Sequence, residues 1–120
     1  MKCIKGGDDF VTSVTPDTAG NVIVAGYYEG TIDLDYGNAK YLVSSNGQYD
    51  MYLAKYDSSG NFLWAKTMGS SLQDYAYAVQ TDSYGNIYLT GTCSRHADFD
   101  GSNDTAFIHP NGPSNDGIIF

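Results

Sequence analysis

The sequence predicts an all-β fold assembled from repeated antiparallel sheets, and three observations lead to this prediction. The pentapeptide Asp-x-x-Gly-Asn begins at Asp17, Asp57 and Asp82. Segments rich in Val, Ile, Tyr, Phe and Thr flank each copy, and their apolar residues lack the period of a helix. The first and third copies lie in longer stretches that match at a shift of 65 residues. A fixed period of this size is typical of propellers, solenoids and other arrays.

The match at this shift extends well outside the pentapeptides. The identical pairs are Asp9/Asp74, Val14/Val79, Asp17/Asp82, Gly20/Gly85, Asn21/Asn86, Gly26/Gly91, Asp33/Asp98 and Asp35/Asp100. In each pentapeptide, the Asp side chain is expected to accept a hydrogen bond from the backbone N–H two residues later. The Gly is expected to adopt a positive φ, as a type I turn with a G1 bulge requires. The pentapeptides therefore predict hairpin turns.

Each turn joins two predicted strands. The strands of one period are Phe10–Thr15, Val22–Tyr28, Met51–Tyr56 and Phe62–Thr67, and the next period begins with Tyr77–Thr81 and Ile87–Thr92. The apolar runs 22–25 and 62–65 indicate strands that are buried on both faces. A four-stranded antiparallel meander covered by equivalent sheets on both faces is a propeller blade, whereas a β-sandwich favours inside–outside alternation.

The chain is expected to form a single partial propeller unit over residues 1–120 with fewer than two periods. Blade one is predicted over about residues 8–68 and a partial blade two over about residues 69–120. Asp116–Phe120 parallels Asp50–Ala54 and predicts the start of a further third strand. Propellers typically close with about 4–8 blades. The expected partners are therefore further blades, supplied either by a longer parent chain or by like subunits that complete a ring.

Two segments, Asp50–Lys66 and Asp74–Gly91, resemble the bacterial β-propeller (SBBP) repeat, and Gly30–Asp35 resembles its variant with a longer blade. The resemblance covers most of the chain. It implies a secreted or cell-surface bacterial protein in which the propeller is a scaffold or a binding module. Extracellular localisation is expected from this resemblance alone, because the N-terminal residues do not have the pattern of a signal peptide.

Six Lys and Arg residues against fourteen Asp and Glu residues give a formal charge of −8. This charge argues against a nucleic-acid partner, because phosphate binding needs a clustered basic surface. No apolar segment approaches the ~18–20 residues of a membrane span. The two cysteines, Cys3 and Cys93, are too few for a disulfide framework, and both free thiols and a single bridge remain open.

Antiparallel order places the tight turns on one rim and the longer connections on the other, so binding is expected at the rim that carries the 29–49 connection. Asp33 and Asp35, with Asp98 and Asp100 in the second period, present alternate carboxylates of the kind that suits Ca²⁺. The competing interpretation is that these carboxylates cap turns or face solvent on an edge strand. No EF-hand pattern is present, and no other cofactor is expected.

Tyr28 ends the second predicted strand, and Tyr36 and Tyr41 lie in the connection that follows it. They are candidate ligand-binding residues, because exposed rings stack on sugars or on partner side chains. The alternative is that they pack between sheets. His96 and His109 lack the third protein ligand that zinc sites generally use.

No motif of nucleophilic catalysis or of nucleotide binding is present, so the sequence predicts no catalytic residue. It predicts a non-catalytic scaffold or binding module for a protein or glycan ligand. The alternative is a lectin-like, carbohydrate-binding propeller, which oligomerisation would complete. An enzymatic role would require residues from further blades.

Overall fold

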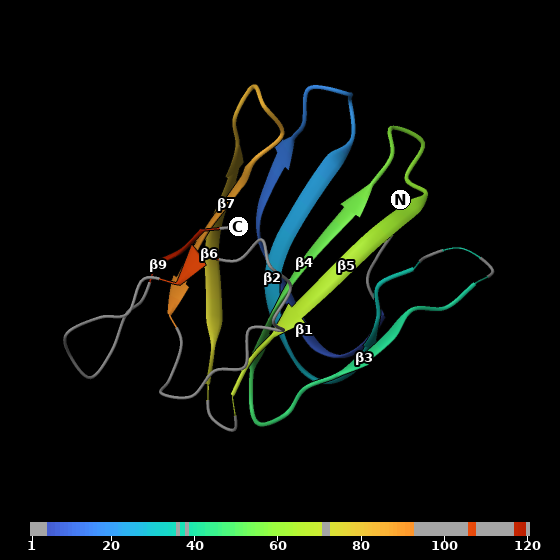
Figure 1. Cartoon of the computed structure of the whole chain (residues 1–120). Coiled ribbons are helices and arrows are strands. Elements are labelled where there is room, and N and C mark those ends of the chain that lie inside the picture. Colours follow the sequence, from blue (N-terminus) through green and yellow to red (C-terminus); the bar gives the residue numbers. More distant parts are fainter. Residues whose placement is uncertain are drawn as a thin grey trace.

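The computed structural model describes residues 5–35, 37, 39–70, 73–92, 106–107 and 117–119. The strands are β1 Lys5–Pro16, β2 Val22–Asp33, β3 Leu42–Ser44, β4 Asp50–Tyr56, β5 Phe62–Met68, β6 Tyr75–Thr81, β7 Ile87–Thr92, β8 Ala106–Phe107 and β9 Gly117–Ile119. They form two antiparallel sheets that lie next to each other (Figure 1), which confirms the all-β prediction. None of these residues belongs to a helix, so the described part of the chain contains no membrane-spanning helix.

The first sheet, which we call blade one, has the spatial order β1-β2-β4-β5, and all neighbouring strands are antiparallel. Ala25 in β2 lies opposite Ser13 in β1 and opposite Leu53 in β4. Each strand therefore pairs with the next one of the four along the chain, as the predicted meander requires. The short strand β3 is an addition, and it pairs with the far end of β2.

The second sheet, blade two, has the order β6-β7-β9-β8. β9 pairs with β7 as β4 pairs with β2, which confirms the strand predicted within residues 116–120. β8 occupies the outer position next to β9. The described residues do not close a ring, so the observed architecture is that of a partial propeller. The source of further blades stays a prediction.

The two blades pack against each other through one apolar core. Its buried residues are Ile23, Ala25, Met51, Leu53 and Met68 from blade one and Ala76, Val79 and Leu89 from blade two. Two hydrogen bonds connect the inner strands: the Val79 N–H donates to Ser13 Oγ at 3.1 Å, and Thr81 Oγ1 donates to the Pro16 carbonyl at 2.7 Å. Burial of these apolar side chains stabilises the contact between the two blades.

The three Asp-x-x-Gly-Asn turns have a common geometry and lie on one rim (Figure 1). Asp17 Oδ1 accepts hydrogen bonds from the N–H groups of Ala19 and Asn21, both at 2.9 Å, and Gly20 has a φ of 83°. These features confirm the predicted turn chemistry. The Asn also has a role that the pattern did not reveal, because Asn21 Nδ2 donates to Asp17 Oδ2 at 3.0 Å. The turns that begin at Asp57 and Asp82 repeat these bonds.

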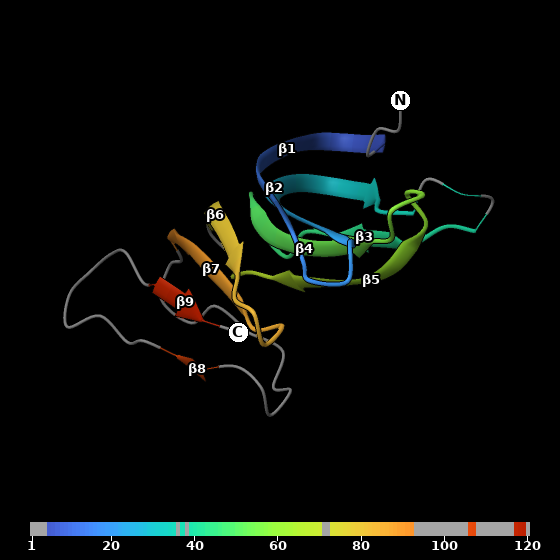
Figure 2. The same cartoon turned by 90° about the horizontal axis from the view of Figure 1, so that it is seen from above.

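β1 and β2 are longer than predicted, and they curl over the face of blade one that points away from blade two (Figure 2). Register shifts between Gly6 and Asp8 and between Val11 and Ser13 mark irregularities in β1, and bulges of this kind bend a strand. Gly26 is required in the curl, because a Cβ at this position would collide with the carbonyl oxygen of Phe10.

The concave side of the curl encloses a second apolar core. Its buried residues are Val24, Tyr28, Ile32, Leu34, Tyr52, Ala54 and Tyr56. The Tyr56 hydroxyl donates to the Leu34 carbonyl at 2.7 Å, which fixes the end of the curled ribbon against β4. Blade one therefore covers much of its outward face with its own chain.

Two expectations about the strands were wrong. The run 62–65 was expected to be buried on both faces, but β5 is an edge strand of blade one and Leu63 is 46% exposed. The strand that was expected to end at Tyr28 continues to Asp33, because the residues after it pair with β3. By contrast, Ile23, Val24 and Ala25 are buried, which confirms the prediction for residues 23–25, whereas Val22 is half-buried.

Candidate binding surface

Asp33 and Asp35 cap the turn that follows β2. Asp33 Oδ1 accepts hydrogen bonds from the N–H groups of Asp35 and Tyr41, both at 3.0 Å, and Asp35 Oδ1 accepts one from Gly37 at 2.8 Å. These are the contacts of turn-capping carboxylates. In the described part of the chain, no three His, Cys, Asp or Glu side chains gather as metal ligands would. The Ca²⁺ site stays a prediction.

The candidate tyrosines lie in different environments. Tyr28 is fully buried in the second core, so its ring offers no surface to a ligand. Tyr41 is 40% exposed and packs on Phe62 with the ring centroids 4.9 Å apart. Ligand binding by these residues stays a prediction. The remaining candidates lie outside the described residues: Tyr36, Asp98, Asp100, His96, His109, Cys3 and Cys93.

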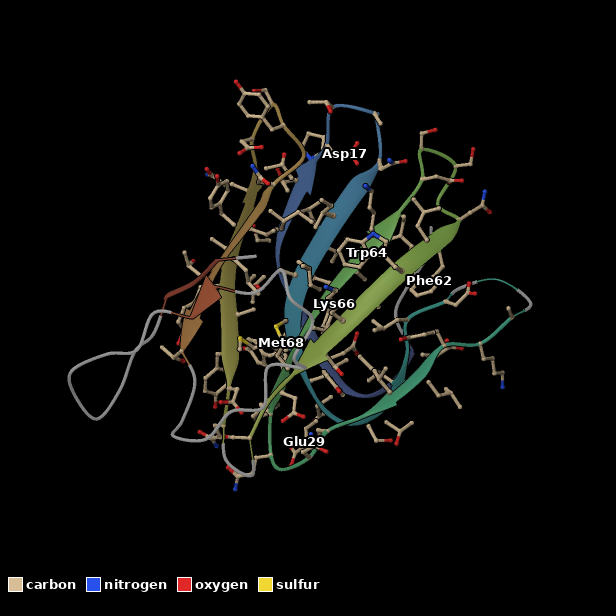
Figure 3. All side chains as sticks on the ribbon, viewed as in Figure 1. Asp17, Glu29, Phe62, Trp64, Lys66 and Met68 are labelled. Carbon is tan, nitrogen blue, oxygen red and sulfur yellow. The ribbon has the colours of Figure 1, made fainter. Side chains whose placement is uncertain are left out.

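The structure brings together a different set of residues at the rim opposite the hairpin turns. Phe10 in β1 lies directly opposite Tyr27 in β2, and two residues further along the strands Asp8 lies opposite Glu29. The Phe10 and Tyr27 rings are stacked, with centroids 4.9 Å apart and an interplanar angle of 27°. Figure 3 shows Glu29 at this rim, far from Asp17 at the turns. We call these four residues the ring–carboxylate patch.

The alternation of a strand places all four side chains of the patch on the same face of the ribbon, the face toward blade two. Phe10 is 44% exposed and Asp8 is also exposed, whereas Tyr27 and Glu29 are half-buried. The patch thus presents a ring surface that continues into two carboxylates.

Two further tyrosines flank the patch and tie it to blade two. Tyr27 meets the ring of Tyr49 edge-on at 5.5 Å and the ring of Tyr75 edge-on at 4.8 Å. Partial burial raises the pKa of the Tyr49 phenol, and the charges of Glu29 and Asp8 raise it further. The pKa of Tyr75 is also raised, mainly by burial and in small part by Glu29. The carboxylates of the patch are therefore close enough to act on the rings electrostatically.

The carboxylates of the patch have no basic partner among the described side chains. Among the described side chains, Lys55 Nζ forms an ion pair with Asp17 Oδ2 at 2.7 Å, but this pair lies on the other rim. Asp8 and Glu29 occupy opposite positions of an antiparallel pair, where like charges destabilise the sheet. A cationic group placed between them would remove this repulsion.

Two buried carboxylates, Asp50 and Asp74, lie next in sequence to the flanking tyrosines. Asp50 Oδ2 accepts a hydrogen bond from the Asn46 N–H at 2.8 Å, and Asp74 Oδ2 accepts bonds from the N–H and the hydroxyl of Ser70 at 2.6 and 2.9 Å. Burial raises the pKa of Asp50, and the nearby charge of Asp74 raises it further. Both side chains are buried, and their hydrogen bonds order the connections between strands.

Sequence reasoning did not identify the ring–carboxylate patch, because its members are brought together by strand pairing. One available signal was the repeat itself, which places the aromatic residues Phe10 and Tyr75 at equivalent positions. The spacing Asp8-x-Phe10 opposite Tyr27-x-Glu29 becomes informative only once the register is known.

Over 93 residues the chain is 27% identical to an uncharacterized WD repeat-containing protein of Acanthamoeba polyphaga mimivirus. The match covers 66% of the chain and 7% of the viral protein, so the chain spans a small part of that relative. No protein-family model matches the chain. Because WD repeats form four-stranded propeller blades, the similarity supports a propeller-like repeat. The narrower SBBP assignment stays a prediction.

Proposed function

We propose that this chain is a non-catalytic propeller-type scaffold that binds a protein partner at the rim opposite its hairpin turns. The observation that carries the proposal is the ring–carboxylate patch, where the stacked Phe10 and Tyr27 lie beside two carboxylates that lack a described basic partner. Aromatic residues in the centre of a surface and charged residues beside them are the usual composition of a protein interface.

The similarity to a WD repeat-containing protein supports the scaffold part of this proposal. The rigid sheets hold the rim residues in a fixed arrangement, which lowers the entropy cost of binding. From the SBBP resemblance alone, we place the chain in a secreted or cell-surface bacterial protein that supplies further blades.

A selection of peptides from a random display library tests the proposed surface. We expect the selected peptides to lose at least tenfold in affinity for Phe10→Ala and for Tyr27→Ala. Leu42→Ala is the control, because Leu42 is a large exposed apolar residue in β3, away from the patch. If every selected peptide binds all three variants like the wild type, the proposed surface is wrong.

Glycan binding is the second candidate function. The exposed ring of Phe10 beside the carboxylate of Asp8 suits a sugar, whose apolar face stacks on rings and whose hydroxyl groups donate to carboxylates. A glycan array with and without Ca²⁺ separates the candidates. Binding of a glycan that Phe10→Ala abolishes would favour the lectin-like function. Dependence of that binding on Ca²⁺ would support the metal site predicted at Asp33 and Asp35.

A further inference from the structure

We infer that the ring–carboxylate patch recognises an arginine side chain of a basic peptide segment. The inference rests on the proposed function and specifies the chemistry of the partner. Its starting point is the order of the groups along the ribbon: two stacked rings, followed two residues later by two opposed carboxylates. Two residues of an extended strand span about 7 Å, a separation that one guanidinium group bridges when its face lies on a ring and its N–H edge points toward the carboxylates.

The carboxylate pair selects for a cation. Asp8 and Glu29 lie directly across the ribbon from each other, and none of the lysine or arginine side chains that the structure describes forms an ion pair with them. A guanidinium group placed between the two carboxylates would donate hydrogen bonds to both, because its N–H groups point outward in a planar fork. An acidic or neutral segment would leave the repulsion in place, and the net charge of −8 would oppose an acidic one at longer range.

The rings select arginine over lysine. A guanidinium lies flat on an aromatic face and is weakly hydrated, whereas an ammonium is a strongly hydrated point charge. The exposed side of Phe10 offers such a face, since its other side is stacked on Tyr27. Tyr49 and Tyr75 support Tyr27 from the sides and keep the stacked pair in place.

The test uses three capped pentapeptides of sequence Gly-Xaa-Gly-Xaa-Gly, with Xaa as arginine, lysine or citrulline, titrated into the ¹⁵N-labelled chain at low salt. We expect the arginine peptide to bind at least threefold more tightly than the lysine peptide, and the citrulline peptide to show no binding. Amide shifts are expected at residues 8–10 and 27–29 and not at the hairpin turns.

Matched variants locate the contact. Asp8→Asn, Glu29→Gln and Phe10→Leu are each expected to weaken the arginine peptide at least fivefold. Asp9→Asn is the charge control, because Asp9 follows Asp8 directly but faces the other side of β1, opposite Tyr28. Tyr84→Leu is the aromatic control, because Tyr84 is 90% exposed in a hairpin turn. Both controls are expected to bind the arginine peptide like the wild type. The amide spectrum of each variant reports whether it is folded.

Three kinds of outcome overturn the inference in different ways. If Asp9→Asn weakens binding as much as Asp8→Asn, or if lysine and arginine peptides bind equally, the attraction is due to net charge alone. If library peptides without arginine bind the patch and Phe10→Ala abolishes that binding, the chemistry of the partner is wrong but the proposed function stands. If neither library nor basic peptides respond to patch variants, both proposals fail.

Discussion

Some residues at equivalent repeat positions are exposed in blade one and buried in blade two. Val14 and Val79 are identical residues at equivalent positions, yet Val14 is 57% exposed and Val79 is 3% exposed. Val11 is 54% exposed, whereas its equivalent Ala76 is fully buried. In blade two these positions pack on blade one, and in blade one the same positions lie beside the curled ribbon without a neighbouring sheet. A repeat position therefore sets the structure of a strand but not its burial.

The contact between the blades also depends on residues that the repeat does not conserve. Ser13 accepts the Val79 N–H and Thr81 donates to the Pro16 carbonyl. The positions equivalent to Ser13 and Thr81 are Ala78 and Pro16, and neither carries a hydroxyl group. Suppose that blade two of one copy took the place of blade one in this contact, and that blade one of a second copy took the place of blade two. The same pair of side-chain hydrogen bonds could not form in that contact, because Ala78 and Pro16 would occupy the two positions. The observed interface is specific to this pair of blades.

The largest effect is expected from the core that the blades share. Leu53→Ala removes a buried side chain from it and should lower the free energy of unfolding by about 2–5 kcal/mol. Leu63→Ala on the edge strand should change it by less than about 0.5 kcal/mol. Urea unfolding followed by Trp64 fluorescence measures both. Equal losses would mean that β5 is covered in solution.

Truncation of the equivalent valines tests the comparison itself. Val79→Ala should lower the free energy of unfolding by about 1–2 kcal/mol, because the buried residue loses apolar contacts with blade one. Val14→Ala should change it by less than about 0.5 kcal/mol. Chemical unfolding of the two variants side by side gives the difference. A loss for Val14→Ala as large as that for Val79→Ala would show that a further sheet covers β1.

A pH-dependent effect is expected at Asp50, which orders the connection that leads into β4. Burial raises the folded pKa of Asp50 above 3.8, so the folded state favours the protonated form. The contribution of this group to stability is fully present below pH 3.8 and is lost as the pH rises through the raised pKa. Asp50→Asn should remove this dependence and be more stable than the wild type at neutral pH. Parallel pH curves of unfolding for the two proteins would contradict the assignment.

The smallest effect separates two hairpin turns of identical pattern. The hydrogen bond from Lys55 is the main reason that the pKa of Asp17 is lowered, whereas the hydrogen bond from Asn86 is the main reason for Asp82. Lys55→Met should therefore raise the pKa of Asp17 and leave the pKa of Asp82 unchanged. A carboxyl NMR titration measures both groups in one experiment. A shift at Asp82 would show that the turns are coupled.

The local parts of the fold were predictable because the responsible residues are neighbours in sequence. Asp17 and Gly20 shape their turn through contacts within five residues, so the pattern alone indicated it. The curl of β1 and β2 was not predictable, because it depends on register irregularities near Gly6 and Val11 and on packing against Tyr56. The exposure of Leu63 was not predictable either, because it depends on the position of β5 at the edge of the sheet and not on the hydrophobicity of the residue.

The sequence indicated the rim of the candidate site but not its residues. The candidate tyrosines, which begin at Tyr28, drew attention to the same end of the strands, yet Tyr28 alternates into the core while Tyr27 faces the patch. Phe10 and Asp8 join them only through pairing between strands. Asp33 carried two interpretations in the sequence, and its hydrogen bonds show that it caps a turn.

The hydrogen bonds within each hairpin turn have a practical consequence. Each loop is held by hydrogen bonds between its own Asp and Asn, and all three loops lie on one rim (Figure 1). Asp17 in the first loop lies at the opposite end of the molecule from Glu29 (Figure 3). A linker, dye or immobilising tag joined to Ser58 or Ser83 would leave the opposite end oriented toward solution. These loops are therefore suitable sites for attaching the protein to a support.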